Sequence, residues 1–348
     1  MEFKRKLSYF LRNVAFNKKL INYIAIETSK KLKLKKPLGL PHTIMIEPNN
    51  ICNLKCPLCP TGERSLKRPL GQMALDTFQK VLDDVGDSTI HLRLWNWGEP
   101  LLNKDLFKMI KRANRKKIFI NISTNGTFLN KDNVQDLVDC GLDEIIVSVD
   151  GASQKTYEKY RIGGHLDTIL KGIKLLAEAK KEKNSKTPYI NLQFILMSHN
   201  EHEISEIRKI AHELGVNALT FKSVGIMDVE LDKDIEKYLP NNPDMGRYIS
   251  ENNKLTRKLT ARNMCDTMYD ETTIAWDGNV LPCCNDPHGS YSLGNVLKED
   301  LKDIWIGEKY MKLRKIILTK KVSIPMCKDC PGHTRDAPVK REILNPIY

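Results

Sequence analysis

The sequence predicts an α/β fold in which a partial (β/α)6 barrel of the TIM type follows an N-terminal helical extension and precedes a small cysteine-rich C-terminal domain. Three observations predict it: strand-like and helical segments alternate between residues 42 and 222, cysteines gather in two groups, and basic residues concentrate at the N-terminus. Strands that alternate with helices favour a parallel sheet with right-handed crossovers. Six such units favour a barrel or partial barrel over a small open sheet.

Residues 1–37 form the predicted extension. They hold eleven Lys or Arg residues and two acids, a net charge of +9 out of +13 for the chain. Their apolar residues recur at helical spacing. The helices either dock on the main domain with solvated lysines, or form a surface that touches anionic lipid or an acidic partner. Nucleic acid is not expected, because basic and aromatic residues do not interleave in the body of the chain.

The barrel is expected over residues 38–225. Its strands are predicted at residues 42–48, 90–98, 118–124, 144–150, 189–197 and 218–222, and its helices at 73–86, 103–115, 131–140, 153–183 and 202–214. In βα barrels, functional residues gather at the C-terminal ends of the strands. Beyond the barrel we expect a linker over 226–260, the cysteine-rich domain over 261–335 and a tail over 336–348.

The cysteines also indicate the compartment. Nine cysteines in clusters are too few for a secreted disulfide scaffold and are typical of metal ligands in an intracellular enzyme. Arg12 and Asn13 interrupt any signal-peptide core, and no apolar run approaches the roughly 18–20 residues of a spanning helix. We therefore expect a cytoplasmic protein, with membrane contact limited to its periphery.

Cys52, Cys56 and Cys59 follow the first strand with the spacing C-x3-C-x2-C. Structural zinc requires four ligands, and no fourth Cys or His lies nearby. Four cysteines hold a [4Fe–4S] cluster completely. Three would leave one iron open to bind a substrate or cofactor directly.

The loop CNLKCPLC closely resembles the cluster loop of radical S-adenosylmethionine enzymes. The resemblance implies a [4Fe–4S] cluster on these three cysteines, with S-adenosylmethionine chelated at the open iron. WGEP is similar to the glycine–glutamate–proline segment of that family, with Trp97 where a glycine often stands. Leu58 departs from the family, because many members carry an aromatic residue there. The cofactor-binding residues that the resemblance implies are Gly98, Glu99, Pro100, Ser123, Asn125, Ser148, Asp150 and Arg161.

The second cysteine group resembles the SPASM or shorter twitch extension of the same family. It implies one auxiliary [4Fe–4S] cluster, because a second one would require about seven cysteines. Cys284 is an alternative to Cys283 as a ligand, and Cys140 is expected to be a structural thiol. The predicted ligands are Cys265, Cys283, Cys327 and Cys330, spaced C-x17-C-x43-C-x2-C.

The resemblance also implies a reaction. A ferredoxin or flavodoxin gives an electron that cleaves S-adenosylmethionine, and the resulting 5′-deoxyadenosyl radical removes a hydrogen atom from an unactivated substrate carbon. A fully ligated auxiliary cluster indicates a two-electron oxidation of a sugar or alcohol. A peptide or protein maturase is the alternative, and a non-catalytic zinc or redox module would leave the first three cysteines unexplained. The oxidation also requires a base, which the sequence does not select among Glu47, His199, Lys222 and Asp228.

Overall fold

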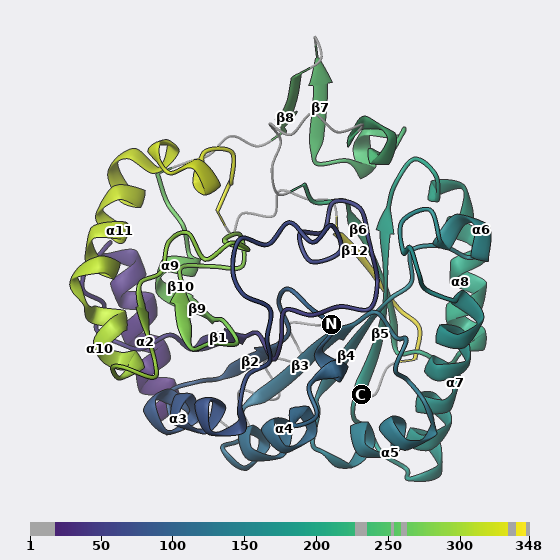
Figure 1. Ribbon diagram of the computed structural model, residues 1–348, viewed down its shortest axis with the longest axis horizontal. Coiled ribbons are helices and arrows are strands. Elements are labelled where there is room, and N and C mark those ends of the chain that lie inside the picture. The colour runs from purple at the N-terminus through teal and green to yellow at the C-terminus, as the bar shows by residue number, and fades with distance from the viewer. Residues whose placement is uncertain (1–17, 227–234, 252–253, 259–262, 333–338, 346–348) are drawn as a thin grey trace. The chain divides into compact units, whose positions relative to one another are not determined.

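The computed structural model describes residues 18–226, 235–251, 254–258, 263–332 and 339–345 (Figure 1). The chain divides into two compact units. Unit 1 comprises residues 1–50, 67–121 and 261–333, and unit 2 comprises residues 51–66, 122–260 and 334–348. The division falls within one strand, between Asn121 and Ile122, and residues 261–333 of the cysteine-rich region belong to unit 1.

Unit 1 contains a mixed sheet with the strand order β11-β10-β9-β1-β2-β3. β1 pairs in parallel with β2 on one side and with β9 on the other, and β10 and β11 continue antiparallel from β9. A turn at Asp277–Gly278 joins β9 to β10, and Gly278 has φ +83°. The strands are β1 (Thr43–Ile46), β2 (His91–Leu94), β3 (Phe119–Thr124), β9 (Glu271–Ile274), β10 (Asn279–Leu281) and β11 (Gly294–Asn295).

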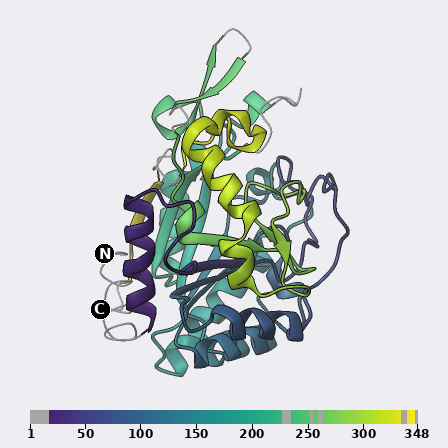
Figure 2. The ribbon, with the colours of Figure 1, turned by 90° about the vertical axis from the view of Figure 1, so that its left-hand side faces the viewer.

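The helices of unit 1 bury one apolar face each. In α3, the buried side chains of Phe78, Val81, Leu82 and Val85 recur every three or four residues, as expected of a half-buried helix. α10 packs beside α3, and α2 packs beside α9 (Figure 2). The helices are α2 (Lys18–Lys31), α3 (Leu75–Val85), η1 (Pro100–Leu102), α4 (Leu106–Arg115), α9 (Thr267–Asp270), α10 (Leu301–Ile306), α11 (Glu308–Lys320), η5 (Lys321–Ser323) and η6 (Pro325–Cys327).

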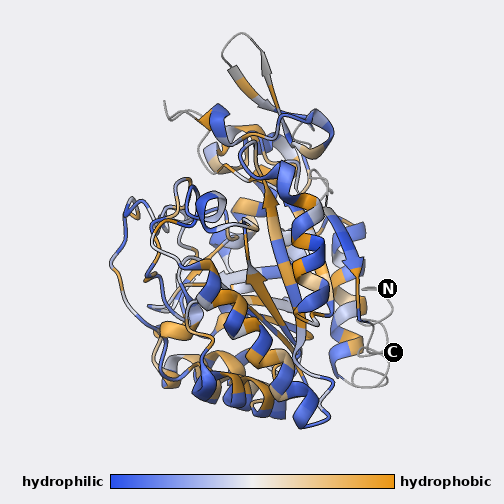
Figure 3. Cartoon of the chain, turned by 90° about the vertical axis from the view of Figure 1, so that its right-hand side faces the viewer, coloured by the Kyte–Doolittle hydropathy of each residue, from blue (hydrophilic) through white to orange (hydrophobic). Residues whose placement is uncertain are grey.

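Unit 2 contains the strands β4 (Glu144–Ser148), β5 (Tyr189–Leu196), β6 (Ala218–Ser223) and β12 (Val339–Ile343), in that order across the sheet. The first three are parallel, and β12 is antiparallel to β6. The strands are largely apolar and the outer faces of the helices are polar (Figure 3). The other elements are α5 (Lys131–Asp139), α6 (Gln154–Tyr157), α7 (Leu166–Glu182), η2 (Glu201–Glu203), α8 (Ile204–Glu213), η3 (Ile235–Tyr238), η4 (Pro243–Met245) and the hairpin strands β7 (Tyr248–Glu251) and β8 (Lys254–Arg257).

All six strands predicted for the barrel are present as β1–β6. Gly307, in an extended conformation, separates α10 from α11. Two predicted segments contain strands that the sequence did not indicate. The predicted linker contains the β7–β8 hairpin, and the predicted tail contains β12. Short strands of this kind depend on partners far along the chain, so their local sequence is a weak signal.

Candidate metal centres

The three cysteines of the first group lie on one loop of unit 2. Cys56 is buried and Cys52 and Cys59 are half-buried, and all are free thiols. The loop folds tightly: Leu58 has φ +63°, and a Cβ at Gly62 would lie 2.5 Å from the carbonyl oxygen of Cys56. Its backbone therefore requires a glycine at position 62.

The spacing of the sulfurs distinguishes between kinds of metal site. Four thiolates on one zinc ion, each at about 2.3 Å, would lie roughly 3.8 Å from one another. Among the described residues, which include all nine cysteines, no three sulfurs lie within 4.8 Å of one another. Among the described residues, no three thiols therefore have the close spacing that a zinc ion bound by three or four thiolates would impose.

Polar donors face the sulfurs of this loop. Asn125 Nδ2 lies 3.7 Å from Cys52 Sγ, and Arg161 Nη1 lies 3.8 Å from Cys56 Sγ. Burial raises the pKa of Cys56 to about 11, although the Arg161 charge opposes that rise. Hydrogen-bond donors near a thiolate favour its charged form, which is the form that binds a metal. The loop therefore fits a cluster held by three thiolates.

Asp150 and Arg161, both predicted to contact the cofactor, form an ion pair with each other, and their contact with the cofactor stays a prediction. Asp150 Oδ2 accepts hydrogen bonds from Nε and Nη2 of Arg161, both at 2.6 Å, and Oδ1 accepts from the Ile195 backbone at 2.7 Å. Burial lowers the pKa of Arg161, but the Asp150 charge outweighs it and holds that pKa well above its usual value. The pair connects the end of β4 to the cysteine loop through Cys56.

The other predicted cofactor residues of unit 2 lie at strand ends. Asn125 follows β3 and donates to Asn53 Oδ1 at 2.9 Å, so it holds the cysteine loop. Ser123 is half-buried at the end of β3, and Ser148 is buried at the end of β4. Within the described residues, neither serine side chain is hydrogen-bonded to the cysteine loop, and a role toward S-adenosylmethionine stays a prediction for both.

The segment Gly98–Pro100 lies in unit 1 and is shaped by Asn49. Gly98 has φ +140°, and a Cβ there would lie 2.3 Å from the Asn49 carbonyl oxygen, so only glycine fits. Asn49 Nδ2 donates to the Glu99 carbonyl oxygen at 2.8 Å. The Glu99 carboxylate is buried and caps η1, accepting from the Leu101 backbone at 3.1 Å. This segment therefore offers backbone rather than a free carboxylate.

The second cysteine group lies entirely in unit 1. Cys265 precedes α9, Cys283 follows β10, Cys327 ends η6, and Cys330 lies three residues further on. Burial raises the pKa of Cys327 to about 12 and that of Cys283 well above its usual value. Asn285 Nδ2 lies 3.8 Å from Cys330 Sγ. Four thiols in a buried setting with a polar donor fit a cluster with a complete cysteine set.

The surroundings of Cys283 and Cys284 differ. Burial is the largest cause of the raised pKa of Cys283, and the neighbouring Cys284 thiol adds to it. The thiols of Cys265 and Cys327 raise this pKa further. Burial also raises the pKa of Cys284. The next causes are the charges of Glu271, which raises this pKa, and Arg93, which lowers it; the two residues form an ion pair at 2.8 Å, and Cys330 makes a smaller contribution. Cys283 therefore faces more of the predicted ligands, while Cys284 faces a salt bridge.

We expect Cys283→Ser to lose the auxiliary cluster and Cys284→Ser to keep it. The two residues are adjacent and similarly buried, so each serves as the control for the other. The measurement is iron and acid-labile sulfide per chain after anaerobic reconstitution. About eight irons should fall to about four in the first variant only. The reverse pattern would make Cys284 the ligand.

Of the candidate bases, the structure describes three. Glu47 is buried and bound by Arg68 through two hydrogen bonds of 2.5 Å, and Lys222 lies on β6 opposite Val339. His199 is half-buried, and its Nε2 has no hydrogen-bond partner among the described residues. Burial lowers the pKa of His199, so its imidazole is neutral at pH 7. The fourth candidate, Asp228, lies outside the described residues.

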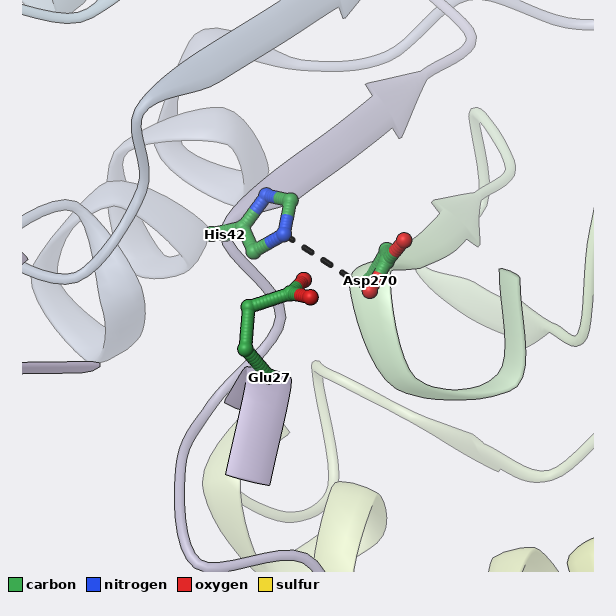
Figure 4. Close-up of side chains that lie close together, drawn as sticks. All are labelled: Glu27, His42 and Asp270. Atoms are coloured by element: carbon green, nitrogen blue, oxygen red, sulfur yellow. Dashed lines mark ion pairs between the residues drawn. The ribbon is translucent and has the colours of Figure 1, made fainter. Parts of the chain in front are cut away.

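Glu27, His42 and Asp270 also lie close together, in unit 1 (Figure 4). Lys30 Nζ donates to Glu27 at 2.8 Å and to Asp270 at 3.0 Å, and His42 Nε2 lies 3.7 Å from Asp270. The Lys30 ammonium thus neutralises the carboxylates that a metal ion would require. We interpret this group as an ion-pair network that holds α2 against α9.

Two family models match this chain. The model of the radical SAM superfamily matches residues 46–214, and that of the SPASM iron–sulfur cluster-binding domain matches residues 265–331. The tungsten-containing aldehyde ferredoxin oxidoreductase cofactor-modifying protein of Pyrococcus furiosus is 26% identical over 318 residues, covering 82% of this chain and 86% of that protein.

Two further relatives are more distant. The PqqA peptide cyclase of Bradyrhizobium diazoefficiens is 23% identical over 195 residues, which span 56% of this chain and 50% of that protein. The crystal structure of Streptococcus suis SuiB bound to S-adenosylmethionine has a TM-score of 0.64 at 17% identity, covering 90% of this chain and 77% of that one. That likeness supports the α/β partial-barrel fold. The domains that match bring [4Fe–4S] clusters and S-adenosylmethionine as cofactors, and this chain belongs to the radical SAM superfamily as a member with a C-terminal SPASM domain.

Proposed function

We propose that this radical SAM enzyme oxidises a small molecule of the sugar or alcohol class by two electrons. The observation that carries the proposal is the set of four buried or half-buried thiols in unit 1, namely Cys265, Cys283, Cys327 and Cys330. A cluster with four cysteine ligands has no iron open to a substrate and is suited to electron transfer.

The proposed reaction divides its work between cofactors and protein. When bound, the clusters supply the electron that cleaves S-adenosylmethionine and accept one electron from the substrate, with a ferredoxin or flavodoxin as the donor. Oxidation of an H–C–O–H group to a carbonyl releases one hydrogen atom, one electron and one proton. The hydrogen atom passes to the 5′-deoxyadenosyl group, and the protein must take the proton.

We assign the proton to His199. Its ring contacts Tyr238, with centroids 6.2 Å apart, and Tyr238 packs against the apolar cluster that contains Cys56. A neutral imidazole whose Nε2 has no hydrogen-bond partner among the described residues can accept a proton, whereas the Glu47 carboxylate is already bound by Arg68.

To test the reaction, the reconstituted enzyme is incubated with dithionite, S-adenosylmethionine and a panel of polyols, amino sugars and short peptides. The expected product has lost two hydrogens and forms in a 1:1 ratio with 5′-deoxyadenosine. Oxidation confined to the polyols or amino sugars would support the proposal. Products without loss of hydrogen would contradict it.

We expect His199→Asn to slow product formation by roughly 10²–10⁴-fold, the usual contribution of a general base. The control is His202→Asn, because His202 is 66% exposed and three residues away. Activity should also fall as the pH drops through the lowered pKa of His199, because the protonated imidazole cannot accept a proton. Equal activity of the two variants would remove His199 from this role.

A peptide substrate is the second candidate. PqqA peptide cyclase is named for a peptide substrate, and SuiB has been crystallised with its precursor peptide SuiA. The peptides in the panel address this alternative directly. Loss of two hydrogens from a peptide, with none from the polyols and amino sugars, would replace the first proposal with this one.

We also propose that α2 contacts an anionic membrane surface. Its outer face exposes Ile21 (70%) and Ile24 (55%), with Lys18 and Lys31 exposed at its two ends. Apolar side chains beside lysines are typical of helices that lie on anionic lipid. None of the described helices is long and apolar enough to cross a membrane.

We therefore expect Ile21→Ser/Ile24→Ser to weaken co-sedimentation with phosphatidylserine vesicles by roughly tenfold or more, because two isoleucines leave the interface. Leu70→Ser is the control, since Leu70 is also exposed (63%) but lies outside α2. Vesicles of neutral phosphatidylcholine should bind weakly. Equal binding by all three proteins would exclude this surface.

A further inference from the structure

Lys321 is a fully buried lysine beside the second cysteine group. It opens η5 and has no solvent exposure. Its Nζ donates to the Cys330 carbonyl oxygen at 2.6 Å and to the Met264 carbonyl oxygen at 3.2 Å. Cys330 is a predicted ligand, and Met264 directly precedes another, Cys265.

Among the described residues, no carboxylate forms an ion pair with this ammonium. Within the part of the chain that the structure describes, Lys321 forms no ion pair, and its Nζ contacts only the two carbonyl oxygens. Burying a charge is costly unless an opposite charge compensates it, and two carbonyl dipoles compensate only in part. Within the described residues, no further group that compensates the Lys321 charge is hydrogen-bonded to it.

Lys19 is a second buried lysine of unit 1, and its positive charge is compensated by the end of a helix. Its Nζ donates to the carbonyl oxygens of Lys116 and Lys117, both at 2.8 Å. These carbonyls lie at the C-terminal end of α4, where the helix dipole supplies partial negative charge. The carbonyls that Lys321 contacts are those of Met264 and Cys330, and neither residue lies in a helix or strand.

We propose that Lys321 is the counter-ion of the auxiliary cluster and favours its reduced form. A [4Fe–4S] cluster with four thiolates is negative overall and becomes more negative when it gains an electron. A buried positive charge nearby therefore raises its reduction potential, because attraction is strong in a medium of low dielectric constant. The inference rests on the proposed function, in which this cluster accepts the electron of the substrate.

The test measures the midpoint potential of the auxiliary cluster alone. The full chain carries Cys52→Ala, Cys56→Ala and Cys59→Ala, so that only the second group holds a cluster. Lys321→Gln, Lys321→Arg and Lys19→Gln are compared in this background by redox titration followed by electron paramagnetic resonance. Lys321→Gln should shift the equilibrium at least tenfold toward the oxidised form, which is about 59 mV for one electron. Lys321→Arg and Lys19→Gln should match the parent.

Each other outcome has a definite meaning. Loss of iron in Lys321→Gln with full iron in Lys321→Arg would support the proposal, because the retained charge is what matters. An unchanged midpoint in Lys321→Gln, or loss of iron in both variants, would overturn it in favour of a packing role. The titration uses neither S-adenosylmethionine nor substrate. A shifted midpoint together with no substrate oxidation would therefore refute the proposed function and leave the counter-ion in place.

Discussion

Replacing Cys52, Cys56 and Cys59 together with alanine is expected to abolish 5′-deoxyadenosine formation. The three thiols lie on one loop with hydrogen-bond donors at two of the sulfurs, and no other cysteine lies in that loop. The variant should hold about four irons per chain, against about eight in the wild type. Iron, acid-labile sulfide and the nucleoside are measured after anaerobic reconstitution with dithionite and S-adenosylmethionine.

Cys140→Ala is the control for this experiment. Cys140 is buried beside the end of α5, and its thiol donates to the Leu137 carbonyl oxygen at 3.5 Å. It should leave both iron content and nucleoside formation at wild-type values. Nucleoside formation by the triple variant would refute the assignment of the first cluster, and zinc in place of iron in the wild type would refute both clusters.

Arg161→Met is expected to lower the free energy of unfolding by about 3–5 kcal/mol, because it leaves the buried Asp150 carboxylate without its counter-charge. In the wild type, Asp150 is fully buried and Arg161 donates to it twice at 2.6 Å. After the substitution, the Ile195 backbone N–H, at 2.7 Å, is the remaining hydrogen-bond donor to this carboxylate among the described residues. Urea denaturation of the apoprotein measures the change.

The matched control is Arg208→Met in the same unit. Arg208 also pairs with a carboxylate, Glu342 at 2.9 Å, but its side chain is 39% exposed. Solvent screens such a pair, so its loss should cost less than about 1 kcal/mol. Similar losses in the two variants would show that the Asp150–Arg161 pair is no more important to stability than a surface contact.

The sequence predicted the parallel strands well because their pattern is local. Each of β1–β6 contains buried apolar residues, and turn-forming residues follow at the ends of β3 and β4. It could not predict β12, since the segment Val339–Ile343 becomes a strand only through its pairing with β6, more than 100 residues earlier. The same limit applies to the β7–β8 hairpin, which the sequence indicated only as a linker.

The candidate site likewise has features that could be predicted from the sequence and features that could not. The cysteine spacing predicts the metal-binding residues, because thiolate ligands follow one another at short, regular intervals in the sequence. The ion-pair partners of charged residues were not predictable from the sequence: Asp150 pairs with Arg161, and Glu47 pairs with Arg68. Nothing in the sequence indicates that Lys321 is buried, because lysines are rarely buried and only the folded structure shows its position.

The parallel pairing of β1 with β9 has a consequence for synthesis of the chain. Thr43 pairs with Glu271, so the ribosome must add more than 220 residues before β1 gains its second neighbour. Until then β1 is an unprotected edge with open backbone donors and acceptors, and such edges are where nascent chains associate wrongly. A chain that stops at residue 260 would keep that edge permanently, so the region that binds the second cluster also closes the sheet of the first half of the barrel.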